Sequence, residues 1–108
     1  MKSKKLEGKA TPLLELIDYQ ADSIVSRTII DKEAGTVTAF AFDKDQGLSE
    51  HTAPYDAIVQ ILEGEVRVTV SGRPIIVKQN EITIMPANQP HTLFAVTQFK
   101  MLLTMIKA

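Results

Sequence analysis

Cysteine is absent from the 108-residue sequence, and no apolar run reaches the length of a membrane-spanning helix. The absence of cysteine excludes a disulfide framework and a thiolate metal site. A membrane helix needs about 18 consecutive apolar residues, so no membrane partner is expected. The basic N-terminus is not followed by the apolar segment of a secretory signal, and we therefore expect a cytoplasmic protein.

An excess of basic residues is also missing. Twelve lysines and arginines stand against thirteen aspartates and glutamates, which gives a formal net charge of −1. Binding to nucleic acids normally requires a positive surface, so a nucleic-acid partner is not expected. Apolar residues make up 44% and charged residues 23% of the chain. This composition and length indicate one ordinary globular domain.

The chain divides into an N-terminal arm over residues 1–20 and a folded domain over residues 21–108. The arm is rich in lysine at its start and contains the ambiguous segment TPLLELIDYQ. Thr11 followed by Pro12 resembles the N-cap and first position of a helix. Because the segment is short, one helical turn and an edge strand both fit it.

Short apolar and β-branched runs dominate the chain after residue 20. Turn signals separate these runs about every eight to twelve residues, a spacing typical of an all-β sandwich or barrel. Glu63 and Gly64 predict a two-residue hairpin turn between AIVQIL and EVRVTV, with Gly64 in a positive-φ conformation. Ser71 and Gly72 predict a further turn, and no later segment predicts a helix of about ten residues or more.

Two of the expected strands are apolar on both faces. In FKMLLTMI, near the C-terminus, Leu102 and Ile106 lie on the face opposite Phe99 and Met101. A strand that is apolar on both faces needs cover on both sides, whereas a barrel of this size has a single interior. We therefore expect a second subunit to cover the outer face, in a homodimer.

Part of the sequence pattern G-x5-H-x-H-x3,4-E-x6-G precedes Gly64. Gly64 takes the place of the closing glycine, and counting back from it places His51 at the first histidine. Ala53 stands at the second histidine and Ala57 at the glutamate. Neither alanine has a side chain that could bind a metal ion or take part in acid–base chemistry.

The segment NEITIMPANQPHTLFA fits a second pattern, G-x5-P-x-G-x2-H-x3-N, more closely. Pro86 and His91 are in place, and Ala95 replaces the closing asparagine. Asn80 and Asn88 replace the two glycines. Asparagine tolerates left-handed backbone geometry better than other non-glycine residues, so both replacements are expected to preserve the turns.

Residues 36 to 106, which carry both patterns, resemble the small single-domain members of the cupin superfamily. The resemblance implies an all-β cupin jelly-roll barrel, or double-stranded β-helix, in which metal-binding members use three histidines and a glutamate. Of these four ligands only His51 and His91 remain. Asp56 and Gln60 are candidate extra ligands, although strand alternation turns both away from the barrel interior. The resemblance implies Ni, Zn, Fe, Mn or Cu as the candidate ion.

The alanines at the lost ligand positions predict a roomier barrel. We expect a small organic ligand there, oriented by the two histidines, and packing of the alanines against bulky neighbours is the alternative. Three functions stay open: a binding protein, a metal-dependent enzyme of the oxygenase, isomerase or decarboxylase type, and a barrel whose dimer is its function. The expected pocket is lined by His51, His91, Ala53, Ala57, Val59, Ile61, Phe40, Phe42 and Ala95.

Overall fold

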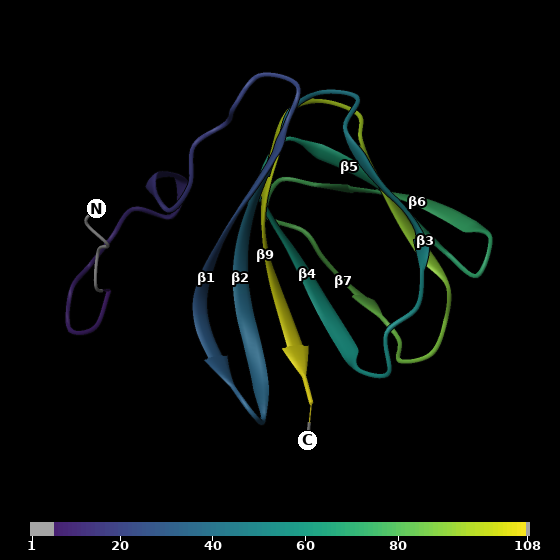
Figure 1. The fold of residues 1–108 in the computed structure, drawn as a ribbon. Helices are drawn as coiled ribbons and strands as arrows, with labels where there is room; N and C mark the ends of the chain where they lie inside the picture. Colours follow the sequence, from purple (N-terminus) through teal and green to yellow (C-terminus); the bar gives the residue numbers. More distant parts are fainter. Residues whose placement is uncertain (1–5, 108) are drawn as a thin grey trace.

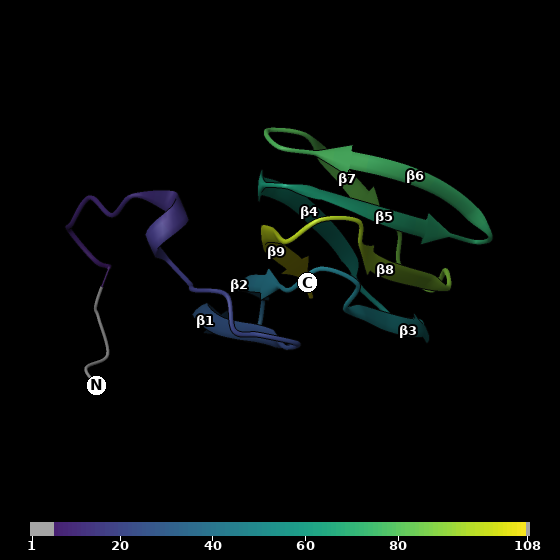
Figure 2. The same cartoon turned by 90° about the horizontal axis from the view of Figure 1, so that it is seen from above.

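The computed structural model describes residues 6–107, which form two antiparallel sheets that face each other around one core (Figure 1). One sheet has five strands in the order β1-β2-β9-β4-β7, and the other has four in the order β3-β8-β5-β6. Figure 2 shows the two layers from above. The predicted all-β jelly-roll barrel is confirmed. The strands are β1 (Ile24–Lys32), β2 (Gly35–Phe42), β3 (Gly47–His51), β4 (Asp56–Glu63), β5 (Glu65–Val70), β6 (Arg73–Lys78), β7 (Ile82–Met85), β8 (His91–Ala95) and β9 (Phe99–Ile106).

The inner faces of both sheets carry the apolar alternation that the sequence predicts. In β5, Val66 and Val68 are buried while Arg67 between them is exposed. At one end of the core, the rings of Phe42 and Phe99 stack with their centroids 4.5 Å apart, and both side chains are 0% exposed. Apolar side chains from both sheets are thereby removed from water, which is the main driving force for folding.

The turn at Gly64 differs from the predicted hairpin. Gly64 has the expected positive φ, at +83°, but the flanking strands β4 and β5 belong to different sheets and do not pair. The chain turns a corner here, and a Cβ atom at this position would collide with the carbonyl oxygen of Gln98 and lie 2.8 Å from the Cβ of Phe99. The hairpin prediction was wrong because local sequence signals a turn without specifying how the flanking strands pair.

The other predicted turns have the expected geometry. Ser71 and Gly72 connect the paired strands β5 and β6, with φ values of 49° and 80°. Asn80 and Asn88 also have positive φ, at 69° and 67°. Asparagine therefore takes over the left-handed geometry at both positions where the resemblance implied glycine.

The ambiguous segment of the arm forms one helical turn, the 3-10 helix Leu13–Glu15, and no edge strand. Pro12 occupies the N-cap, one residue later than predicted. Residues 1–5 of the arm and Ala108 lie outside the described residues. Within residues 6–107, no helix is long and apolar enough to cross a membrane.

The arm is held on the outer face of the five-stranded sheet. Leu16 and Ile17 are buried against two alanines of β2. The ammonium group of Lys100 in β9 donates a hydrogen bond of 2.6 Å to the carbonyl oxygen of Leu14, and Lys100 is only 7% exposed. A buried ammonium needs such an acceptor, so this contact joins the arm to the last strand.

Candidate functional site

Two histidines meet where β3 ends and β8 begins. His51 is the last residue of β3, His91 is the first residue of β8, and they are direct partners in the antiparallel pairing. Their Nε2 atoms lie 3.1 Å apart, and their ring centroids 4.3 Å apart. The fold therefore brings together the only two histidines of the chain.

A β-bulge brings His51 opposite His91. Leu48 pairs with Leu93, so regular pairing would place Glu50 opposite His91. The register shifts between Leu48 and His51 and places His51 there instead. A bulge adds one residue to one strand and re-aims the side chains that follow it. The histidine pair is thus a product of this irregularity in β3.

Hydrogen bonds to the backbone determine the tautomers of both rings. The Nδ1 atom of His51 lies 2.7 Å from the carbonyl oxygen of Ser49, and that of His91 lies 3.2 Å from the carbonyl oxygen of Gln89. A carbonyl oxygen only accepts hydrogen bonds, so each neutral ring carries its proton on Nδ1 and a lone pair on Nε2. These tautomers leave both Nε2 atoms, which lie within hydrogen-bond distance of each other, as acceptors, and a donor group or a cation placed at both would satisfy them.

The two rings differ in exposure. His91 is 6% exposed, whereas His51 is open to solvent. Burial lowers the pKa of His91, the hydrogen bond to the Gln89 carbonyl acts in the opposite direction, and the charge of His51 adds to the lowering. Below the ordinary histidine pKa the ring of His91 is therefore harder to protonate than a free imidazole, and His51 forms the solvent-facing side of the pair.

We expect the protein to lose stability as the pH falls below about 6.5, the ordinary pKa of histidine. The pKa of His91 is lower than this in the folded chain. Between the two values the unfolded chain binds more protons, so the free energy of unfolding decreases with falling pH and levels off below the lowered pKa. Urea unfolding at about pH 7.5 and about pH 5.5 measures the loss. The His91→Gln variant has no imidazole at this position, so its free energy of unfolding should decrease less between the two pH values. An equal decrease in both proteins would contradict the lowered pKa of His91.

The candidate extra ligands lie on the outside of the barrel. Gln60 is exposed in β4. Asp56 is also exposed, and its Oδ1 atom accepts a hydrogen bond of 2.9 Å from the backbone N–H of Ala87. Over residues 6–107, no group of three or more His, Cys, Asp and Glu side chains is placed to hold a metal ion.

Most of the residues expected to line a pocket are packed in the core. Val59 and Ala95 are 0% exposed and Ala57 is 4% exposed, so neighbouring side chains fill the space around them. This burial supports the alternative that the alanines pack against bulky neighbours. Ala53, which follows β3, is half-buried instead. The other expected lining residues of the core are Ile61, Phe42 and the partly buried Phe40.

Two methionines flank Ala57 in the five-stranded sheet. Ala57 pairs with Met85 of β7 on one side and with Met105 of β9 on the other. Both methionines belong to, or pack against, the same core cluster. Methionine is flexible and fills irregular gaps, which accounts for the close packing around the small side chain. The apolar–polar alternation of the sequence could not connect these methionines with Ala57, because β4 pairs with β7 and β9, which lie far from it along the chain.

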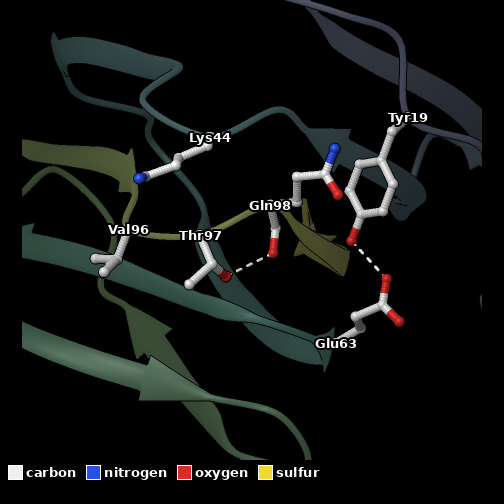
Figure 3. Close-up of a pocket in the computed structure, with 6 residues that line it drawn as sticks. All are labelled: Tyr19, Lys44, Glu63, Val96, Thr97 and Gln98. Atoms are coloured by element: carbon white, nitrogen blue, oxygen red, sulfur yellow. Dashed lines mark hydrogen bonds between the residues drawn. The ribbon is translucent and has the colours of Figure 1, made fainter.

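A separate hollow of about 560 Å³ lies where the arm meets the barrel (Figure 3). Tyr19 donates a hydrogen bond of 2.6 Å to Glu63. Burial, this bond and the charge of Glu63 all raise the pKa of Tyr19, so the phenol stays protonated. Thr97 donates to the carbonyl oxygen of Gln98, and Lys44 lies across the hollow from Tyr19. Of these residues the sequence pointed only to Glu63, and only as part of a turn. The hydrogen bond from Tyr19 to Glu63 joins the arm to the barrel.

Comparison with known proteins indicates a family. The sequence profile of the cupin domain family matches residues 40–107, more than half of the chain. No curated protein matches the chain significantly. Among solved structures, a conserved protein of unknown function from Streptococcus pyogenes is 34% identical, with a TM-score of 0.89 and an alignment covering 94% of this chain and 89% of that one.

Two further structures agree with this result. A cupin 2 conserved barrel domain protein from Leptotrichia buccalis is 40% identical, with a TM-score of 0.84, over 88% of this chain and 46% of that one. The present chain thus spans less than half the length of the Leptotrichia protein. A cupin superfamily protein from Desulfitobacterium hafniense, at 23% identity, covers 100% of both chains with a TM-score of 0.91 and supports the fold.

Proposed function

Since the chain belongs to the cupin domain family, as its two motifs predicted, we propose that it binds a small ligand at the pair formed by His51 and His91. The observation that carries the proposal is the pair of Nε2 atoms facing each other at 3.1 Å. Two acceptors directed at one place suit an organic molecule that presents a hydroxyl or ammonium donor to both. The exposed ring of His51 gives access from solvent, and the buried ring of His91 orients the molecule.

A divalent transition metal ion is the second candidate occupant. Metal–nitrogen bonds of about 2.0–2.1 Å place two histidine nitrogens about 2.9 Å apart at a right angle and about 3.3 Å apart at the tetrahedral angle. The observed 3.1 Å separation of the Nε2 atoms of His51 and His91 lies between these values. Imidazole suits Zn, Cu, Fe and Ni, and these ions, with Mn, are the candidates.

An ion held by His51 and His91 would have open coordination positions, because the described residues supply no third side chain of the usual ligand types. Catalytic metal sites keep such a position open for water or substrate. The ion supplies Lewis-acid polarisation of a substrate oxygen when bound. This second candidate function is therefore a metal-dependent cupin enzyme of the oxygenase, isomerase or decarboxylase type, with a weaker site than one built from four protein ligands.

Binding at the histidine pair is testable by calorimetry and thermal-shift measurements on untagged protein. The probes are Ni, Zn, Fe, Mn and Cu ions and a panel of small hydroxy acids and amines. We expect at least one probe to bind one site per chain and to raise the Tm. The double variant His51→Gln/His91→Gln should bind this probe about a hundredfold more weakly, since two contacts of about 1.5 kcal/mol each are lost.

Glu50→Gln provides the matched control. Glu50 is an exposed neighbour of His51, but the bulge leaves it out of register with His91. This variant should bind the probe as the wild type does. Unchanged binding by the double histidine variant, or no binding of any probe by the wild type, would refute a ligand site at the pair.

A further inference from the structure

One row of paired residues crosses the four-stranded sheet at the end where the histidines lie. His51 of β3 pairs with His91 of β8. Val70 of β5 pairs with His91 on one side and with Arg73 of β6 on the other. Directly paired residues of antiparallel strands point to the same face of a sheet. Because Val70 packs against the core, Arg73 begins β6 on the inner face of the sheet, the face that also carries the two imidazoles.

A hollow of about 420 Å³ opens beside Val70, between β6 and β7. These two strands are the edges of the two sheets at this side of the barrel. Sites for small molecules are usually concave and mostly apolar, with a few polar groups that orient the ligand. The hollow has this character, because one guanidinium, of Arg73, lies among apolar walls. The apolar lining residues are Val70, Ile75, Ile84 and Pro86.

Gln89 connects this hollow with the histidine pair. Its backbone carbonyl oxygen lies 3.2 Å from Nδ1 of His91, and its side chain lines the hollow. The hydroxyl of Ser71 donates a hydrogen bond of 3.1 Å to Oε1 of Gln89, which orients the amide. The amide N–H groups of Gln89 then have no acceptor among the described residues. The hollow and the pair therefore adjoin, and Gln89 offers a hydrogen-bond donor next to the pair.

The guanidinium of Arg73 has no partner in the part of the chain that the structure describes: no item of its surroundings pairs with it by ion pair, hydrogen bond or ring contact. A guanidinium presents its N–H donors in a planar fork that matches both oxygens of a carboxylate. A carboxylate bound beside the apolar walls would be screened less by water than one on an open surface. The hollow therefore suits an anion with two oxygens at Arg73.

We propose that the molecule held at the histidine pair is a hydroxy acid, with its hydroxyl group at the two Nε2 atoms and its carboxylate at Arg73. This inference rests on the proposed function and adds the class of ligand. Neighbouring strands lie about 4.8 Å apart, so the backbones of His91 and Arg73, two strands apart, are separated by about 10 Å. An apolar segment of several carbon atoms between the two polar groups would lie over Val70. A simple amine would instead bring a second positive charge close to Arg73.

Two matched probes separate the carboxylate from the rest of the molecule. The compound para-hydroxyphenylpropionate carries both polar groups, whereas para-hydroxyphenylpropionamide has an uncharged amide in place of the carboxylate. In calorimetry the wild type should bind the acid at one site per chain, at least about tenfold more tightly than the amide. Arg73→Gln should weaken binding of the acid at least about tenfold and should not weaken binding of the amide further. Arg73 is exposed, so the fold should persist, as circular dichroism will show.

Arg67→Gln is the matched control. Arg67 lies in the neighbouring strand β5, but on the outer face, where its guanidinium is 4.8 Å from the ring centroid of Phe94. This variant should bind the acid as the wild type does. The inference is overturned if the wild type does not bind the acid, if acid and amide bind equally, or if Arg73→Gln leaves binding of the acid unchanged. The proposed function would survive these results if a metal ion or an amine still binds to the wild type and not to His51→Gln/His91→Gln.

Discussion

Replacing Gly64 with alanine is expected to destabilise the protein by about 3–5 kcal/mol, which urea unfolding followed by circular dichroism will measure. Any side chain at the φ of +83° adopted here costs about 1–2 kcal/mol in backbone conformation alone. The new Cβ atom would also collide with the Gln98 carbonyl and lie 2.8 Å from the Cβ of Phe99. Because these atoms lead into the central strand β9, the corner and the strand cannot both keep their positions.

Gly72→Ala separates the two causes of this loss. Gly72 has nearly the same conformation, with φ of +80°, but a Cβ atom there would meet no other atom within 4 Å. Only the conformational cost of about 1–2 kcal/mol is expected in this variant. Equal losses in Gly64→Ala and Gly72→Ala would show that the close approach to β9 contributes nothing.

Phe99→Ala is expected to cost about 3–5 kcal/mol, the range found when a buried aromatic ring is replaced by a methyl group. Phe99 is 0% exposed and stacks on Phe42 at a centroid distance of 4.5 Å. Its removal leaves a cavity between the two sheets and takes away the aromatic contact. The loss of stability should lower the midpoints of urea and thermal unfolding. Before the transition, the far-ultraviolet circular dichroism spectrum of the variant should resemble that of the wild type.

Phe94→Ala is the control for the removal of a phenyl ring as such. Phe94 is half-buried on the outer face of the four-stranded sheet, beside Arg67. Its replacement loses only partial burial and one exposed cation–π contact, together about 1–2 kcal/mol. A loss as large as that of Phe99→Ala would contradict the location of the core between the sheets.

The strands and tight turns could be predicted from the sequence because their signals are local. The apolar–polar alternation of Val66, Arg67 and Val68 indicates which face of β5 is buried. Asn80 and Asn88 indicate left-handed residues without knowledge of the rest of the fold. The two motifs placed His51 and His91 at related positions through a family resemblance, and the structure brings them into contact.

The features that escaped prediction depend on pairing between distant segments. The bulge that aligns His51 with His91 lies in the polar run SEH, where alternation carries no information about the buried face. Gly64 signalled a turn, but the sheet change depends on partners elsewhere in the chain. The filling of space around Ala57 by Met85 and Met105 likewise follows from the pairing of β4 with two distant strands.

The last strand of the chain occupies the middle of the larger sheet. β9 lies between β2 and β4 and pairs with both along most of its length. During synthesis on the ribosome, β2 and β4 therefore have open hydrogen-bonding edges until the C-terminal segment has emerged. Lys100 of the same strand holds the arm at Leu14, 86 residues away, so this part of the arm becomes ordered only when β9 is in place. The barrel closes only after β9 has been synthesised, and a nascent chain interrupted before Phe99 exposes strand edges on which aggregation can start.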